Sequence, residues 1–144
     1  MTVDDSTLRS ILERARTIAV VGLSDKPERD SNDVARYLQV HGYRVVPVNP
    51  AVSEVLGERS FPSLSAVPPD VRIDIVDIFR RSEQVPPIVD EAIARSVPVV
   101  WMQLGVEHPA AAATARSHGI TVLENRCIKI EHHRLGISAR PNGP

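Results

Sequence analysis

The sequence predicts a single-domain α/β protein in which a parallel sheet carries helices on both faces. Short apolar runs rich in valine and isoleucine alternate along the chain with segments whose apolar residues recur at helical spacing. Apolar runs without polar alternation are typical of parallel strands, which are buried on both faces. The length of 144 residues suits one such domain with a substantial core.

The chain begins with a predicted helix over residues 5–16, because its apolar residues lie on one helical face and Asp5 or Ser6 can cap it. Residues 18–21, with the sequence IAVV, predict a buried strand that ends at Gly22. We expect the first helix to pack on the sheet to which this strand belongs.

A polar turn over residues 23–29 leads into a second predicted helix, for which Asp30 or Ser31 is the expected N-cap. Gly42 supplies the C-terminal stop of that helix, and residues 43–48 predict the next strand. A strand, a crossover helix and a second strand in this order form a parallel βαβ unit.

The rest of the chain continues the alternation. It predicts a short edge strand over residues 59–61, strands over 73–79, 98–102 and 120–123, and helices that begin at Ser82 and cover 108–118 and 127–135. Asp74 is placed near the start of its strand, because Asp74 and Asp77 would otherwise point to opposite faces of a buried strand. These elements predict a Rossmann-like domain over residues 1–138, followed by a flexible tail over 139–144.

Ligands of such parallel sheets bind beyond the carboxyl ends of the strands, where the strand order reverses. The sequence places five segments at those ends: residues 22–29, 49–50, 79–81, 103–106 and 125–127. The first of them predicts a phosphate site, because a glycine turn before a helix directs backbone N–H groups and the positive end of the helix dipole at one point. Lys26 and Arg29 add two cations to that turn.

The turn lacks the G-x-G-x-x-G pattern of dinucleotide-binding proteins, because Gly22 is its only glycine. The acidic residue that would hold a ribose hydroxyl after the second strand is also absent, and Asn49 stands in its place. The sequence therefore favours a phosphate-rich ligand other than NAD.

Six separated segments resemble those of small stand-alone coenzyme A-binding proteins, close to the bacterial YccU-type family. They are VVGLSDKPERDS, GYRVVPVNP, GERSFPSL, DIVDIFRRSEQVP, VVWMQLGV and ENRCIKIEHHRL, in the family's order from about Leu8 to Leu135. The family is similar to the CoA-binding domain of the succinyl-CoA synthetase α subunit. The resemblance implies a Rossmann-like fold that binds coenzyme A (CoA) or an acyl-CoA.

The resemblance and the strand-end positions together indicate which residues contact CoA. The expected contact residues are Gly22, Leu23, Ser24, Lys26, Arg29, Asn49, Pro50, Phe79, Arg80, Gln103, Gly105, Val106 and Cys127. We expect the pyrophosphate on the first turn, the nucleotide along residues 49–50 and 79–80, and the pantetheine arm along 103–106.

Each assignment has an alternative that involves no ligand. Lys26 and Arg29 can be solvated loop residues, Asn49 can close an ordinary turn, and Phe79 can belong to the core. For Cys127, one hypothesis is that the thiol faces the coenzyme thiol and exchanges disulfide with it, because a helix start and neighbouring cations favour the thiolate. The alternative is an inert, buried cysteine.

These observations favour a protein that carries or senses CoA without catalysing a reaction. The alternatives are a small NAD(P)-dependent oxidoreductase, a component of an acyl-CoA ligase, and a vestigial site in a protein that acts through protein contacts. The chain has no G-x-S-x-G nucleophile elbow. Its cysteine and histidines do not follow a metal-binding spacing, so we expect no metal site.

Composition limits the partners and the location. The net charge of −1, with both signs interleaved, gives no basic field for nucleic acid. No apolar run approaches the ~20 residues of a membrane helix, and the first residues do not resemble a secretory signal. With a single cysteine, these features predict a cytoplasmic protein without disulfides. A homodimer stays an open alternative.

Overall fold

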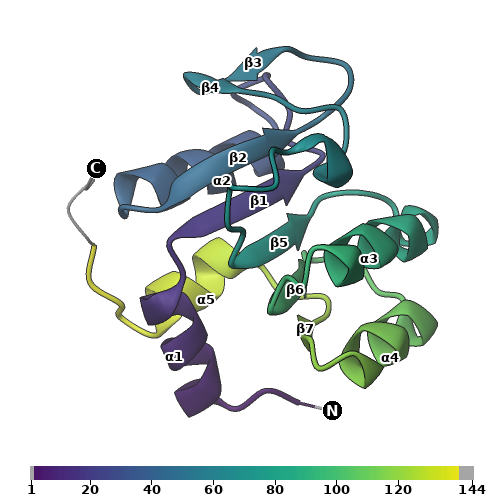
Figure 1. Ribbon diagram of the computed structural model, residues 1–144. Helices are drawn as coiled ribbons and strands as arrows, with labels where there is room; N and C mark the ends of the chain where they lie inside the picture. Colours follow the sequence, from purple (N-terminus) through teal and green to yellow (C-terminus); the bar gives the residue numbers. More distant parts are fainter. Residues whose placement is uncertain (1, 140–144) are drawn as a thin grey trace.

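The computed structural model describes residues 2–139, which form a five-stranded parallel sheet with helices on both faces (Figure 1). The strands lie in the order β2 (Arg44–Val48), β1 (Thr17–Val21), β5 (Ile75–Ile78), β6 (Val99–Met102) and β7 (Thr121–Leu123). Every neighbouring pair in this sheet is parallel. The predicted fold class is therefore confirmed.

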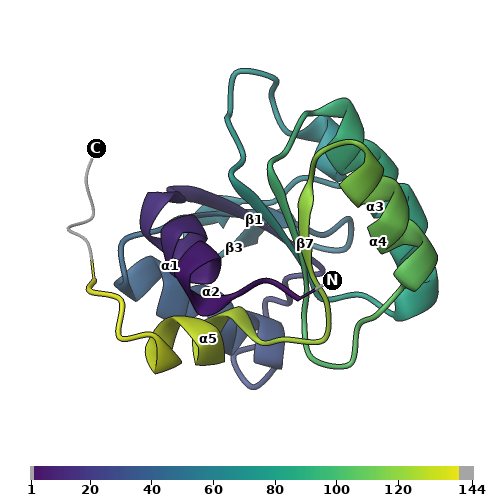
Figure 2. The ribbon, with the colours of Figure 1, turned by 90° about the horizontal axis from the view of Figure 1, so that it is seen from below.

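The helices cover the two faces of the sheet unequally (Figure 2). One face carries α1 (Asp5–Arg14), α2 (Asp30–Val40) and α5 (Ile128–Arg134), and the other carries α3 (Val85–Ala94) and α4 (Pro109–Ser117). Two apolar clusters fill the spaces between helices and sheet. All of β1 is buried: Ile18 and Val20 lie in the cluster beneath α1, α2 and α5, and Ala19 and Val21 lie in the cluster beneath α3 and α4. This two-sided burial explains the uninterrupted apolar run of β1.

Helix α1 packs on the sheet, as predicted. Leu8 and Leu12 of α1 are completely buried in the same cluster as Trp101 of β6. The cap of α1 differs from the prediction, because the Asp4 carboxylate accepts the N–H of Thr7 at 2.8 Å. The N-cap thus lies one residue before the predicted Asp5, which belongs to the first turn.

The predicted caps of two further helices were also wrong. Arg29 is the N-cap residue of α2, while the Ser31 hydroxyl lies inside the helix and holds the preceding loop. Ser82 begins a short 3₁₀ turn (Ser82–Gln84), and α3 starts only at Val85. The Ser31 hydroxyl accepts the N–H of Ser24, and the Ser82 hydroxyl accepts the N–H of Glu107. Because both N–H groups lie outside the first turn of the helix concerned, neither hydroxyl caps that helix.

The predicted edge strand over residues 59–61 is divided between two pairings. Strands β3 (Glu54–Val55) and β4 (Glu58–Arg59) form a small antiparallel hairpin beside β2. Its two turn residues, Leu56 and Gly57, both have positive φ angles, of 53° and 80°. Phe61 instead makes an isolated parallel bridge to Val48 at the edge of the main sheet.

Two aspartates near β5 have contrasting environments. Asp74 precedes the strand, as predicted, and its carboxylate accepts the N–H groups of Arg16 at 2.9 Å and Thr17 at 3.0 Å. Asp77 lies inside the strand, completely buried, and neither carboxylate oxygen finds a hydrogen-bond partner among residues 2–139. Burial raises the pKa of Asp77 well above its ordinary value.

Residues 140–144, which make up most of the predicted tail, lie outside the described residues. Within residues 2–139, none of the helices combines the length and the apolar character that crossing a membrane requires.

Candidate functional site

The strand order reverses between β1 and β5, and this switch point forms the candidate site. The chain leaves β1 toward β2 on one side, whereas β5 lies on the other side of β1. The loops after β1 and β5 therefore begin next to each other at the carboxyl edge of the sheet. The N–H of Phe79 donates to Val21 O at 2.8 Å, and the N–H of Gly22 donates to Val48 O at the same distance.

Gly22 occupies a position that only glycine fits. Its φ angle is +90°, and a Cβ atom built there would lie 2.2 Å from the carbonyl oxygen of Phe79. The same Cβ would lie 3.3 Å from Nε of Arg80. The absence of a side chain therefore allows the two loops to meet, and it keeps the backbone of the first loop close to the second.

The loop after Gly22 is fixed by the start of α2. The N–H of Ser24 donates to the Ser31 hydroxyl at 3.0 Å, and Asn32 Nδ2 donates to Ser24 O at 2.9 Å. The Ser24 hydroxyl accepts the N–H of Lys26 at 3.1 Å. These bonds hold the loop against the first turn of the helix, where the leading N–H groups have no acceptor within the helix.

A pocket of about 270 Å³ opens between this loop and the end of β5. It is lined by Gly22, Ser24, Arg29, Asp30, Ser31 and Phe79. The structure thus brings together four residues that the sequence predicted to contact a ligand. Sequence reasoning assigned Asp30 and Ser31 to helix capping instead. Lys26 is exposed but does not line the pocket.

The charge around the pocket is mixed. Arg29 contributes a cation and the start of α2 contributes the positive end of its dipole, both of which favour an anion. Asp30 places a carboxylate in the same lining. A phosphate group would therefore be held mainly by backbone N–H groups and Arg29, on the side away from Asp30.

Asn49 connects the end of β2 to the loop after β1. Its Nδ2 donates to Leu23 O and its Oδ1 accepts the N–H of Ala51, both at 2.9 Å. Both polar groups of the side chain are thus used within the protein. Asn49 positions the loop, and Pro50 beside it is exposed.

Two of the predicted contact residues direct their side chains into the core. Leu23 is completely buried in the cluster beneath α1, α2 and α5, and Val106 is buried in the cluster beneath α3 and α4. The prediction that these two residues contact a ligand can therefore be met only through their backbone. The backbone carbonyl of Leu23 already accepts from Asn49, and the N–H and carbonyl of Val106 are bonded to Gln103 and Asn125.

Gln103 is buried and joins β6 to the last helix. Its Oε1 accepts the N–H of Ile128, at the start of α5, at 3.0 Å. Nearby, the N–H of Gly105 donates to Oδ1 of Asn125 at 2.7 Å. Gly105 is exposed, and no atom lies within 4 Å of the position of a Cβ there, so a ligand has room to approach.

Cys127 is the N-cap residue of α5 and is partly buried against the core cluster beneath that helix. The neighbouring cations are bonded elsewhere. Arg126 pairs with Glu131 at 3.4 Å, and Lys129 pairs with Asp33 at 2.8 Å. The two cations that the sequence places beside Cys127 are thus paired with carboxylates of the helices.

Helix α5 is docked on α2 by further polar contacts. The Tyr37 hydroxyl lies 2.7 Å from Nδ1 of the buried His132. The start of α2 borders the pocket, and the start of α5 is hydrogen-bonded to Gln103 at the end of β6. The docking of the two helices therefore fixes these two parts of the carboxyl edge relative to each other. Among residues 2–139 there is no group of three or more histidine, cysteine or acidic side chains arranged to hold a metal ion.

These features define a doubly wound α/β protein with a glycine-turn pocket at its switch point, which is the place where such sheets bind ligands. The sequence matches the family of the CoA binding domain over residues 16–133, and the chain belongs to that family. The match covers most of the sequence, including every strand of the sheet and the pocket.

Three relatives illustrate the similarity. The uncharacterized protein YneT of Bacillus subtilis is 42% identical over 125 residues, which are 87% of this chain and 91% of that protein. A hypothetical protein from Pyrococcus horikoshii OT3 is 41% identical, with a TM-score of 0.90 over 94% of each chain. A dinucleotide-forming acetyl-coenzyme A synthetase 1 from Ca. Korarchaeum cryptofilum is 25% identical with a TM-score of 0.70, over 82% of this chain and 27% of the synthetase.

Proposed function

We propose that the protein binds CoA or an acyl-CoA at the carboxyl edge of its sheet and acts as a carrier or sensor without catalysing a reaction. The observation that carries the proposal is the contact between Gly22 and Phe79. At the switch point, this contact leaves a pocket between the backbone of Gly22, which has no side chain, and the start of α2. The N–H groups of a helix start can hold a phosphate group there. Membership of the CoA binding domain family supports the choice of ligand.

The pocket of about 270 Å³ takes only part of such a ligand. In this proposal it holds the pyrophosphate, with Arg29 as a fork-shaped partner and Lys26 reaching from the loop as a point charge. Phe79 and Arg80 border the nucleotide. The pantetheine arm then passes the exposed backbone at Gly105, where no side chain blocks it.

The proposed lack of a reaction rests on the side chains at this edge. Gln103 and Asn49 are both bonded within the protein. The pocket holds two hydroxyls, and each accepts a backbone N–H: Ser31 from Ser24, and Ser24 from Lys26. Within residues 2–139 neither hydroxyl is hydrogen-bonded to the Asp30 carboxylate, so no nucleophile paired with a base is formed there. Binding is therefore the function that this arrangement supports best.

Isothermal titration calorimetry of the purified protein with CoA tests the proposal, with NAD, NADP and ATP as comparison ligands. We expect micromolar binding of CoA and none of NAD. Lys26→Ala and Arg29→Ala should each weaken CoA binding about tenfold, or ~1.4 kcal/mol. Arg9→Ala, at an exposed position of α1, serves as the matched control and should change nothing. Clear NAD binding without CoA binding would establish the oxidoreductase alternative instead.

A second candidate, one part of an acyl-CoA ligase, rests on the similarity to the synthetase. The similar region makes up only 27% of that enzyme chain. A ligase would need the remaining catalytic parts from another chain. Affinity purification of the tagged protein from its own cells decides this: recovery of an ATP-grasp subunit in stoichiometric amount, with CoA- and ATP-dependent activity, would favour the ligase.

A further inference from the structure

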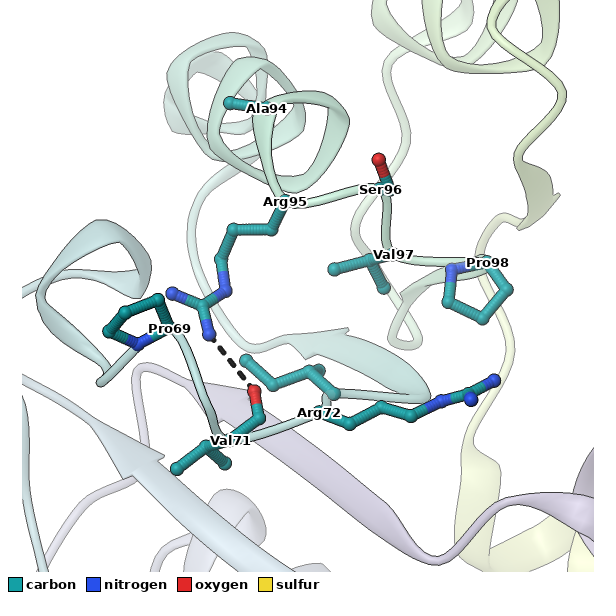
Figure 3. Close-up of a pocket in the computed structure, with 9 residues that line it drawn as sticks. Pro69, Val71, Arg72, Ala94, Arg95, Ser96, Val97 and Pro98 are labelled. Atoms are coloured by element: carbon teal, nitrogen blue, oxygen red, sulfur yellow. Dashed lines mark hydrogen bonds between the residues drawn. The ribbon is translucent and has the colours of Figure 1, made fainter.

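A second pocket lies at the opposite, amino-terminal edge of the sheet (Figure 3). It has a volume of about 510 Å³, within the range of about 300–1,000 Å³ that is usual for small-molecule sites. It lies between the loop that enters β5 and the loop that joins α3 to β6. This pocket and the pocket at the switch point share no lining residue.

The lining of this pocket consists of six apolar residues, Ser96 and two arginines, and more of its accessible surface is polar than apolar. Its apolar members are Pro69, Val71, Ile73, Ala94, Val97 and Pro98. Arg72 and Arg95 border it from the two loops, and no aspartate or glutamate belongs to the lining. In Figure 3 the Arg95 side chain extends from the end of α3 toward Val71, and Arg72 extends below Pro98. The two guanidinium groups point to opposite sides of the pocket in this view. A pocket that combines apolar side chains with guanidinium groups suits a ligand with an apolar part and an anionic head.

Arg95 carries a charge that only neutral groups contact. Its guanidinium donates to the carbonyl oxygens of Val67 at 2.7 Å, Pro68 at 3.1 Å and Val71 at 3.0 Å. Among residues 2–139, no carboxylate lies within ion-pairing distance of Arg95. A guanidinium has five N–H donors, so these three bonds leave donors for a further acceptor.

The Arg72 side chain is exposed and has one polar contact within residues 2–139. Its side chain is 85% exposed, and its contact with Asp74 is a single bond of 3.3 Å from Nε. Asp74 already accepts two backbone N–H groups through its other oxygen. An exposed ion pair of this kind contributes little stability, so an anion in the pocket can compete for Arg72 at small cost.

We propose that this pocket is a second ligand site, which binds a small organic acid by placing its carboxylate or phosphate head against Arg95 and Arg72 and its apolar body on the prolines and valines. Arg72 can present a fork of donors to a carboxylate or a phosphate, because only its Nε makes a hydrogen bond within residues 2–139. Arg95 can add its Nε–H and one Nη1 N–H as single donors, since both hydrogens of Nη2 are already used. The site is separate from the proposed CoA site, because the two lie beyond opposite ends of the strands.

The test is a titration of the ¹⁵N-labelled full chain followed by amide chemical shifts. The probes are hexanoate and hexyl phosphate, with 1-hexanol lacking the charge and inorganic phosphate lacking the apolar body. We expect hexanoate or hexyl phosphate to give saturable shifts at residues 69–73 and 95–97, and the tighter of the two identifies the head group. Hexanol and inorganic phosphate should bind at least about tenfold more weakly.

Two variants test the arginines separately. Arg95→Lys keeps the charge but loses the two remaining N–H donors of the guanidinium, and should weaken binding about tenfold. Arg72→Gln removes both the fork and the charge at an exposed position, and should weaken binding about threefold. Arg9→Gln, at an exposed position of α1, is the matched control and should leave binding unchanged. If Arg95→Lys unfolds the loop that Arg95 holds, Arg72→Gln decides, because its exposed side chain is not needed for folding. Absence of saturable shifts at these residues, hexanol binding as tight as hexanoate, or binding unaffected by Arg72→Gln would overturn the proposal.

Discussion

A Cβ atom on Gly22 would lie 2.2 Å from the carbonyl oxygen of Phe79, so strands β1 and β5 continue into loops that touch backbone to backbone. This contact exists only because residue 22 has no side chain and has a φ angle of +90°. The candidate pocket is bordered by both residues. Its geometry therefore depends on one glycine rather than on the G-x-G-x-x-G pattern of dinucleotide-binding proteins.

Gly22→Ala should be strongly destabilising and should abolish CoA binding. The new methyl group must displace the backbone of Phe79, and alanine resists the positive φ angle. We expect a loss of about 3 kcal/mol or more in the free energy of unfolding, measured by urea denaturation. Gly57→Ala is the matched control: its φ angle of +80° is similar, but no atom lies within 4 Å of the added Cβ. Its cost should be only ~1–2 kcal/mol. Equal losses for the two variants would contradict the role of the close contact.

Much of the fold could be predicted from the sequence. The run from Ile18 to Val21 indicated a buried parallel strand because burial on both faces removes polar alternation. Gly22 indicated the turn that ends this strand. The order of the strands did not follow from the residues themselves, since it depends on crossovers that any right-handed βαβ chain can make.

The side-chain directions at the site were less predictable. Leu23 directly follows the turn glycine and was expected at the ligand, but its side chain completes the core beneath α1 and α5. A residue that leaves a strand can turn to either side, and only tertiary packing decides. Ser31 resembles an N-cap in the sequence, yet its hydroxyl bonds the loop amide of Ser24. The conformation of the loop decides which backbone N–H donates to the Ser31 hydroxyl.

Asn49→Asp tests whether Asn49 positions the loop. Aspartate keeps the acceptor for the N–H of Ala51 but loses the donor to Leu23 O, and it directs a carboxylate at that carbonyl. We expect a loss of about 1–3 kcal/mol in the free energy of unfolding and weaker CoA binding. Gln84→Glu adds the same charge at an exposed position and should have little effect.

The same Asn49→Asp variant should not gain NAD binding in calorimetry. An acidic residue at this position holds a ribose hydroxyl in dinucleotide-binding proteins, but the turn after β1 still lacks the second and third glycines. NAD binding by this variant would mean that Asn49 alone sets the choice of ligand.

In the folded protein, Cys127 should form a mixed disulfide with CoA only slowly. Its side chain packs against a core cluster, and both neighbouring cations are paired with carboxylates. With diamide as the oxidant, the thiols of Cys127 and CoA would each lose a proton and together two electrons to form a mixed disulfide. We expect intact-mass spectrometry to show this adduct rapidly on urea-unfolded protein and little of it on folded protein. Cys127→Ser gives the baseline, and rapid adduct formation on the folded protein would support disulfide exchange with bound CoA.

Asp77→Asn should make the protein more stable at neutral pH but not in acid. Burial raises the pKa of Asp77 well above its ordinary value of 3.8. Between the unfolded and the folded pKa, the folded chain keeps a proton that the unfolded chain has lost. Stability therefore falls as the pH rises from about 4, by up to ~1.4 kcal/mol per pH unit, until the folded pKa is passed. Asparagine is neutral throughout, so this loss disappears.

Urea denaturation of the wild type and Asp77→Asn at several pH values between about 4 and 8 measures the effect. We expect similar free energies of unfolding near pH 4 and a growing advantage of the variant as the pH rises. Asp90→Asn, at an exposed position of α3, is the matched control and should follow the wild type. A difference between Asp77→Asn and wild type that stays constant across this range would show that Asp77 does not keep its proton in the folded chain, and that its carboxylate is stabilised where it lies between β1 and β6.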